Sequence, residues 1–130
     1  MLFRSAAILA GQPIRVFNQG NLERDFTYID DVVAGILAAL ARPADPDRLH
    51  RLYNLGNNRA EPVMRFIEVI EQAVGRKAEL RFEPMQPGDV RITAAEIEDS
   101  RRDLGFEPKT PIDEGIPRFV AWFKEYHGIG

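Results

Sequence analysis

The residues of this sequence that could do chemistry are a few carboxylates and arginines beside turns and short apolar runs. Arg24 stands next to Asp25, and such neighbours form by default a surface ion pair, with anion binding by the guanidinium as the alternative. Asp30 and Asp31 are adjacent carboxylates that invite an acid–base or metal interpretation. Their place at an expected helix start is better explained by the helix dipole, so we interpret them as structural. Asp89 lies in a Pro-Gly-Asp sequence, either as an ordinary turn residue or as a ligand contact.

A complete catalytic constellation cannot be assembled from these groups. The ten glycines form neither a G-x-G-x-x-G nor a G-x-x-G-x-x-G pattern, and neither a P-loop nor a G-x-S-x-G nucleophile elbow occurs. None of the three tyrosines, Tyr28, Tyr53 and Tyr126, is followed four residues later by a lysine that could assist it in proton abstraction. The sequence therefore predicts that the isolated chain lacks both a hydride-carrier site and a catalytic base.

Composition excludes several classes of partner. The 130 residues, enough for one domain, carry 17 Lys and Arg against 20 Asp and Glu, a net charge of −3, so we expect no nucleic-acid partner. Cysteine is absent, and His50 and His127 stand apart from each other, which predicts no metal site. No apolar run approaches the ~18 residues of a membrane span, so we expect no membrane partner and a cytoplasmic protein.

Short strands and amphipathic helices alternate along the chain, which predicts an α/β fold. The clearest helix is the last one. The helix that follows Pro62 has an apolar face at Val63, Phe66, Ile67, Ile70 and Val74, and Gly75 supplies a left-handed cap at its end. A second apolar face follows Asp30 with i, i+4 spacing. The helices are expected at Met1–Gly11, Asp30–Ala41, from Pro62 to Val74, at Ser100–Leu104 and from Pro111 onward, and the strands at Ile14–Phe17, Arg24–Ile29, Leu52–Leu55 and Ala78–Phe82.

Four sequence signatures together carry a resemblance to a known family. The chain resembles the C-terminal part of the extended short-chain dehydrogenase/reductases that epimerise nucleotide sugars, and it is most similar to the UDP-glucuronate 4-epimerases. The order and spacing agree over almost the whole chain. The signatures are RDFTYIDDV at Arg24–Val32, YNLGN at Tyr53–Asn57, MQPGDV at Met85–Val90 and LGFEP at Leu104–Pro108.

The resemblance implies an enzyme of two lobes. An N-terminal Rossmann lobe holds NAD and carries the Tyr-x-x-x-Lys pair, while a C-terminal lobe grips the nucleotide diphosphate. Residues 1–130 resemble the second lobe, the substrate-binding portion, together with the strand and helix that return to the first. On this interpretation the N-terminal Rossmann domain is absent, NAD belongs to the parent family, and no cofactor is expected on this chain alone.

The resemblance also implies five substrate-binding residues. Arg24 matches an arginine that contacts the UDP diphosphate, a role suited to a guanidinium fork on a rigid strand. Asp89 matches a carboxylate that hydrogen-bonds the uridine ribose. Val16 and Phe17 fall where related enzymes hold the uracil edge through backbone groups. Gln86 replaces an arginine of the galactose epimerases and could still bond phosphate or ribose.

Two alternatives remain open from the sequence. The chain could be part of a related nucleotide-sugar 4,6-dehydratase, since those enzymes carry variants of RDFTYIDDV. It could instead be a stand-alone binding module without enzymatic activity. Because the Asp30–Ala41 helix and the Leu52–Leu55 strand would lie against the Rossmann lobe in an intact enzyme, their apolar faces favour self-association here. We therefore expect a homodimer or an exchanged-element oligomer with a UDP-sugar as ligand.

Overall fold

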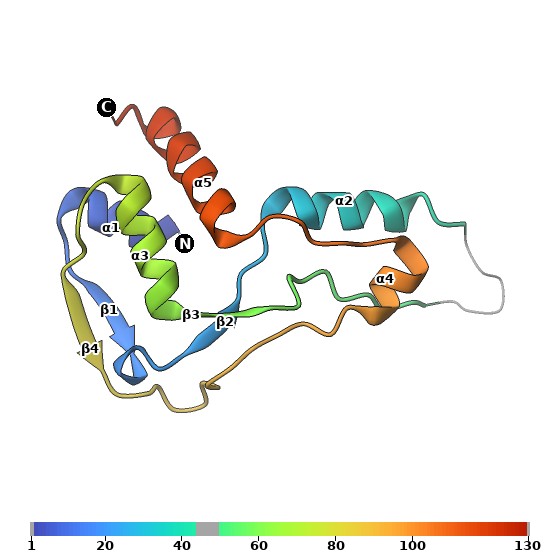
Figure 1. The fold of residues 1–130 in the computed structure, drawn as a ribbon, viewed down its shortest axis with the longest axis horizontal. Helices are drawn as coiled ribbons and strands as arrows, with labels where there is room; N and C mark the ends of the chain where they lie inside the picture. Colours follow the sequence, from blue (N-terminus) through green and yellow to red (C-terminus); the bar gives the residue numbers. More distant parts are fainter. Residues whose placement is uncertain (1, 44–49, 130) are drawn as a thin grey trace.

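The computed structural model describes residues 2–43 and 50–129 and divides into two regions (Figure 1). We call α1, β1, α3, β4 and α5 the body, and α2, residues 50–56 and α4 the arm. Two short strands, β2 and β3, connect them. The elements are α1 Leu2–Ala10, β1 Ile14–Phe17, the 3-10 turn η1 Asn18–Gly20, β2 Glu23–Asp25, α2 Ile29–Leu40, β3 Ala60–Pro62, α3 Val63–Val74, β4 Leu80–Glu83, α4 Glu98–Leu104 and α5 Ile112–His127.

The core of the protein lies in the body, around α3. Its predicted apolar face is confirmed, because Val63, Phe66, Ile67 and Ile70 are all buried and Val74 is partly buried against the same cluster. This face packs against α1 and α5, and the cluster also takes in side chains from β1. Gly75 ends α3 with φ +79°, the left-handed conformation that its lack of a Cβ makes easy.

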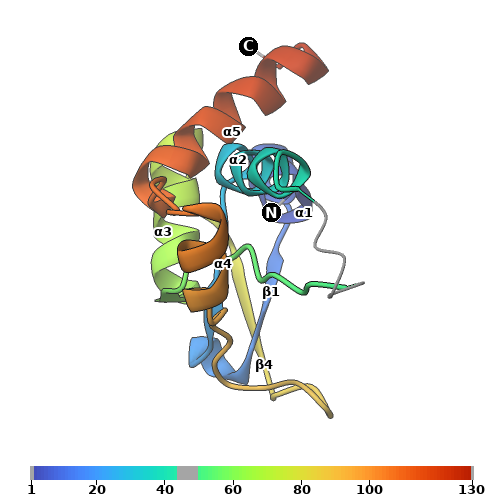
Figure 2. The same cartoon turned by 90° about the vertical axis from the view of Figure 1, so that its right-hand side faces the viewer.

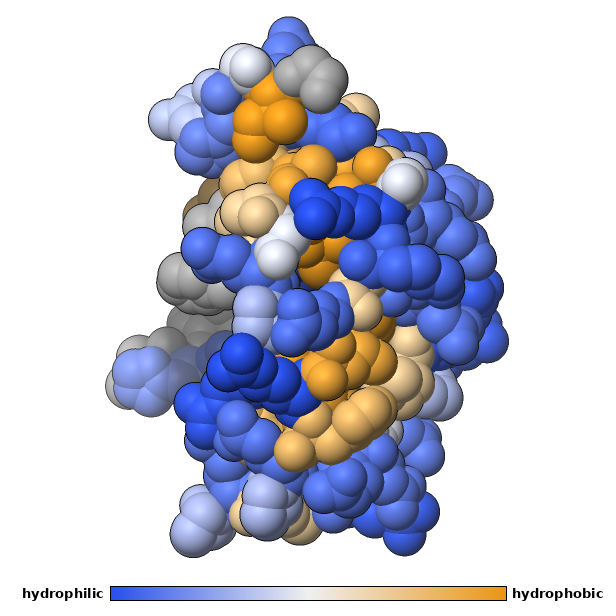
Figure 3. All heavy atoms as spheres, turned by 90° about the vertical axis from the view of Figure 1, so that its left-hand side faces the viewer, coloured by the Kyte–Doolittle hydropathy of each residue, from blue (hydrophilic) through white to orange (hydrophobic). Residues whose placement is uncertain are grey.

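Two pairs of short strands complete the framework. β1 and β4 are parallel, with Ile14 opposite Leu80 and Phe17 opposite Glu83. β2 and β3 are antiparallel and form a separate two-stranded sheet. Figure 3 looks onto the side of the body that carries α1, β1 and β4, and it shows apolar surface crossed by charged side chains. None of the helices in the described ranges is long and apolar enough to cross a membrane.

Two strand predictions were wrong. The strand expected at Arg24–Ile29 ends at Asp25, because Phe26 turns away to stack on Phe66 with 3.9 Å between ring centroids and Ile29 already belongs to α2. The strand expected at Leu52–Leu55 does not form. Within the described residues no neighbouring strand pairs with it, and the carbonyl of Asn54 instead accepts a hydrogen bond from the Ser100 hydroxyl at 2.6 Å.

The helix α2 forms where the sequence predicts it, but its apolar side chains face solvent. Leu37 and Leu40 are 60% and 77% exposed, and Val33 and Ile36 are exposed as well. Only Asp31 and Gly35 of this helix are buried. Figure 2, viewed from the end of the arm, shows α2 along its axis with α4 below it. The helix thus lies at the surface of the described chain.

Candidate functional site

The candidate site is built around β2, which presents alternate side chains to opposite faces. The segment that follows the MQPGDV signature runs beside this strand: the Glu23 amide donates to the Arg91 carbonyl at 2.9 Å, and the Thr93 amide donates to the Glu23 carbonyl at 3.2 Å. β3 pairs with the other edge of β2. Arg24 is thereby fixed on a short strand that is hydrogen-bonded on both sides.

Arg24 and Asp89 meet although 65 residues separate them in sequence. Nη2 of Arg24 donates to Oδ1 of Asp89 at 2.7 Å, and Nη1 donates to the carbonyls of Glu23 at 2.8 Å and Arg91 at 3.1 Å. The two side chains are 23% and 29% exposed, so the pair lies partly sheltered with one open side. Arg24 therefore pairs with Asp89 and not with its neighbour Asp25, which accepts backbone amides instead.

The turn that carries Asp89 also carries Gln86. The Asp89 amide donates to the Gln86 carbonyl at 3.1 Å, and Gly88 between them has φ +80°, which favours glycine. The turn expected from the Pro-Gly-Asp sequence is confirmed. Gln86 therefore lies three residues from the Arg24 contact, with an exposed side chain.

Val16 and Phe17 belong to the other sheet, in β1. The Val16 side chain is fully buried, so only its backbone could meet a ligand. The Arg15 guanidinium lies over the Phe17 ring, with 4.8 Å between its Cζ atom and the ring centroid of Phe17. Arg15 also forms an ion pair with Glu83 on β4. These two residues are thus placed on a rigid parallel pair of strands, apart from the sheet that carries Arg24.

Asp25 is a key residue that sequence reasoning missed. Its Oδ1 accepts the Asn57 amide at 2.8 Å, and its Oδ2 accepts the amides of Asn58 at 3.1 Å and Ala95 at 2.9 Å. The carboxylate thus joins β2 to two other segments. Gly56 is required beside it, because a Cβ there would lie 2.3 Å from the Ala95 Cβ. The only sequence signal was this Gly-Asn-Asn turn, whose amides need an acceptor.

Arg4 on α1 is a second residue that sequence reasoning missed. Its side chain is partly buried, and both burial and the charge of Arg24 lower its pKa. The two guanidinium groups therefore influence each other electrostatically.

The carboxylate of Asp31 holds two parts of the chain together. Asp31 is buried and accepts the Thr110 amide at 3.0 Å, which ties α2 to the segment before α5 and supports our structural interpretation. No group of three or more His, Asp or Glu side chains that could hold a metal ion occurs in the described ranges.

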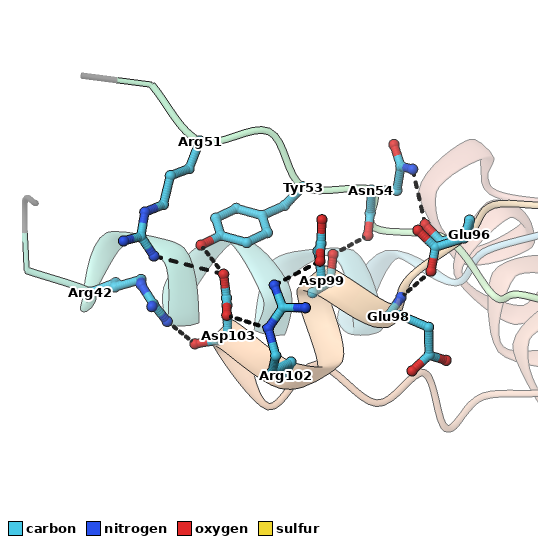
Figure 4. Close-up of polar contacts among 10 residues, drawn as sticks. Arg42, Arg51, Tyr53, Asn54, Glu96, Glu98, Asp99, Arg102 and Asp103 are labelled. Atoms are coloured by element: carbon cyan, nitrogen blue, oxygen red, sulfur yellow. Dashed lines mark hydrogen bonds and ion pairs between the residues drawn. The ribbon is translucent and has the colours of Figure 1, made fainter. Parts of the chain in front are cut away.

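A polar cluster around Asp103 holds the arm together (Figure 4). Its Oδ2 accepts the Tyr53 hydroxyl at 3.1 Å, and Oδ1 accepts Nε of Arg102 at 3.0 Å. Arg51 lies 3.7 Å from the same carboxylate, and Arg42 of the α2 end donates to the Asp103 carbonyl. The hydrogen bond from Arg102 is the main reason that the pKa of Asp103 is lowered. The cluster links three segments, and beside it Gly35 of α2 packs closely against Leu55 and the buried Phe106.

The sequence of this chain is similar to those of known proteins. Residues 3–56 match the model of the NAD dependent epimerase/dehydratase family. UDP-glucuronate 4-epimerase 4 of Arabidopsis thaliana is 37% identical over 96% of this chain and 32% of its own length. An uncharacterized protein of Methanocaldococcus jannaschii is 48% identical over 91% of this chain and 35% of its own length. The chain thus spans about a third of the length of these relatives.

Solved structures agree with the sequence matches. The UDP-glucuronic acid 4-epimerase of Bacillus cereus, solved in complex with UDP-glucuronic acid and NAD, is 26% identical over 94% of this chain and 38% of that chain, with a TM-score of 0.83. The likeness covers the body and the arm together. The chain is therefore similar to proteins of the NAD dependent epimerase/dehydratase family, and it has the fold of the matching part of UDP-sugar epimerases.

Proposed function

We propose that this chain is the UDP-gripping, substrate-binding part of an NAD-dependent nucleotide-sugar 4-epimerase that interconverts UDP-glucuronate and UDP-galacturonate. The observation that carries the proposal is the meeting of Arg24 and Asp89 at 2.7 Å across 65 residues. Under the proposal these side chains take the diphosphate and the ribose hydroxyls, two groups that are neighbours in UDP. Gln86 lies in the same turn, and β1 offers the backbone of Val16 and Phe17 to the uracil.

The residues described here do not fit the NAD that the family uses. A dinucleotide cradle needs a glycine-rich turn that leads from a parallel strand into a helix. β1 leads instead into η1, where a Cβ on Gly20 would meet Met64 at 2.7 Å, so protein fills that space. We therefore assign no step through NAD to this chain. In the intact family enzyme, NAD and the catalytic tyrosine and lysine would belong to the part of the relatives that this chain does not match.

A UDP titration tests whether this chain binds UDP through the proposed residues. Adding UDP to the labelled chain should shift the NMR signals of Phe17, Arg24 and Asp89, with weak affinity because the chain supplies only part of the pocket. Arg24→Gln should reduce the affinity about tenfold or more, since it removes a charge-assisted bond to phosphate. Arg118→Gln, an exposed change on α5, is the matched control. No shift at any of the three positions would contradict the proposal.

The same proposal implies that the chain alone does not turn over substrate. UDP-glucuronate and NAD are incubated with the pure chain, and the sugar nucleotides are separated by chromatography. We expect no UDP-galacturonate, because none of the tyrosines is followed by the required lysine. Formation of UDP-galacturonate at a rate proportional to chain concentration would refute this part of the proposal.

A second candidate function, that of a self-associating module, is favoured by one observation. The apolar face of α2 is exposed at Val33, Ile36, Leu37 and Leu40, and a second copy of the chain could cover it. Sedimentation at rising concentration should then show a dimer or an exchanged-element oligomer. Leu37→Glu should shift it to monomer, whereas Tyr126→Glu on α5 should not. A strictly monomeric wild-type profile would exclude this candidate.

A further inference from the structure

A cavity of about 200 Å³ lies where β2 leads into α2 and where the segment after α4 enters α5. It is lined by Phe26 and Tyr28, which follow β2, by Phe66 of α3, and by Ile112 and Ile116 of α5. Most of its wall is therefore aromatic or aliphatic. Engineered apolar cavities of about 150 Å³ bind benzene, so this cavity has room for a single aromatic ring.

The lining of this cavity is held in place by packing. Phe26 and Phe66 stack with 3.9 Å between their ring centroids, and Ile112 is buried. Tyr28 lies so close to α5 that a Cβ on Gly115 would be 2.8 Å from the Tyr28 Cδ2 atom. The cavity is therefore preformed, which lowers the free-energy cost of binding a ligand there.

The carboxylate of Asp25 is the one charged group that the described residues contribute to this lining. Its Oδ1 accepts the Asn57 amide and the Thr27 hydroxyl, and its Oδ2 accepts the amides of Asn58 and Ala95. A carboxylate has about four lone-pair sites, so these four donors leave none for the ammonium group of a ligand. The negative charge also disfavours an anion. A neutral ligand therefore suits this cavity best.

The cavity also offers uncharged polar groups. Thr110 and Tyr28 line it, and neither hydroxyl has a hydrogen-bond partner within the described ranges. The Thr110 backbone is fixed, because its amide donates to Oδ2 of Asp31 at 3.0 Å. A hydroxyl group both donates and accepts hydrogen bonds, so Thr110 can bond to one hydroxyl group of a ligand.

We propose that this cavity is a second ligand-binding site of the chain, which takes a neutral molecule with one aromatic ring and one hydroxyl group, the class to which phenol belongs. The ring packs against Phe26 and Tyr28, and the ligand hydroxyl bonds to the hydroxyl of Thr110.

The second site is separate from the proposed UDP site. Arg24 and Asp25 are neighbours on β2, so their side chains point to opposite faces. None of the residues assigned to UDP is part of the cavity lining: Val16, Phe17, Arg24, Gln86 and Asp89. The second site therefore does not depend on the proposed function.

NMR titration of the full 130-residue chain with phenol, toluene and benzoate tests the second site. Phenol should shift the amide signals of Tyr28, Thr110 and Gly115, with saturation at a dissociation constant of about 1 mM or below. Benzoate should bind about tenfold more weakly or not at all, because its charge must leave water and approach Asp25. Saturating UDP should leave the affinity for phenol unchanged.

Two variants test the role of the Thr110 hydroxyl. Thr110→Val removes this hydroxyl and should weaken phenol about fivefold, while the affinity for toluene, which has no hydroxyl, stays the same. Toluene binding also shows that the cavity of the variant is intact, and circular dichroism shows that the variant is folded. Tyr126→Phe, which removes an exposed hydroxyl on α5 outside the cavity, is the control and should leave phenol binding unchanged.

The outcomes that contradict the second site are distinct from those that contradict the UDP site. Phenol shifts that do not saturate, or that spread over the exposed face of α2, would overturn the second site whether or not UDP binds. Benzoate binding as tight as that of phenol would refute selectivity for a neutral ligand. An equal loss of phenol and toluene in Thr110→Val would refute the role of the hydroxyl. Competition between UDP and phenol would show that the two sites are not separate.

Discussion

The body and the arm each contain a helix with an apolar face, but they differ in whether that face is buried. In the body, α3 buries its apolar stripe against α1 and α5, so the hydrophobic effect holds the helices together. In the arm, α2 turns a comparable stripe to solvent. Its connection to residues 50–56 and to α4 combines close packing of Gly35 on Leu55 and Phe106 with polar contacts around Asp103. The difference teaches that helix formation and helix burial have separate causes: periodicity creates an apolar face, and only a neighbouring surface can cover it.

The largest expected contrast between the regions comes from truncating one apolar side chain in each. Ile70→Ala removes a fully buried side chain from the body and should lower the free energy of unfolding by about 2–5 kcal/mol, since it leaves a cavity. Leu37→Ala in the arm removes a side chain that is 60% exposed. This variant should change the free energy of unfolding by less than about 0.5 kcal/mol. Urea unfolding followed by circular dichroism measures both.

This comparison also has a clear way to fail. If Leu37→Ala costs as much as Ile70→Ala, the face of α2 is covered in solution. Repeating the measurement at several protein concentrations then identifies the cause. A cost for Leu37→Ala that grows with concentration indicates a second copy on α2 and supports self-association.

A smaller effect is expected where the two regions are joined. Asp25→Ala leaves the amides of Asn57, Asn58 and Ala95 without their acceptor and should cost about 2 kcal/mol, because partly buried donors lose bonds to a charged group. Amide exchange should rise first at residues 57–58 and 95. Glu114→Gln, which removes an exposed i, i+4 pair on α5, is the control. A cost no greater than that of the control would show that Asp25 does not join the regions.

The sequence predicted those parts of the fold that depend on residues close together in the chain, and it failed where a distant partner decides the structure. The apolar face of α3 and its end at Gly75 were predicted correctly, because both depend on residues a few positions apart. The strand at Leu52–Leu55 was predicted wrongly, because a strand exists only with a neighbour to pair with. Phe26 left its expected strand because Phe66, far along the chain, offers a ring to stack on.

Prediction of the site had the same limit. Family resemblance named Arg24 and Asp89, and the structure brings these two together. The Gly-Asn-Asn turn was too weak a signal to identify Asp25, because the partners of Asp25 are backbone amides, which almost every residue has.

The smallest and most local effect concerns pH and the arm. Hydrogen bonds from Arg102 and Tyr53 lower the pKa of Asp103 below its ordinary value. A carboxyl group with a lowered pKa in the folded state stabilises it above the unfolded-state pKa, and the stabilisation is lost as the pH falls through the folded-state pKa. Below about pH 4, where aspartates ordinarily titrate, contacts of Asp103 with residues 51–53 should therefore weaken.

Amide exchange, corrected for its intrinsic pH dependence, measures this loosening. Protection of residues 51–55 should fall with pH in the wild type, while the amides of Ile67 and Ile70 in the body stay protected. Asp103→Asn should lower protection of the arm at neutral pH and remove its dependence on acid. Asp99→Asn, which removes only an exposed partner of Arg102, should keep that dependence. If acid loosens the body and the arm equally, the polar cluster is not what holds the arm.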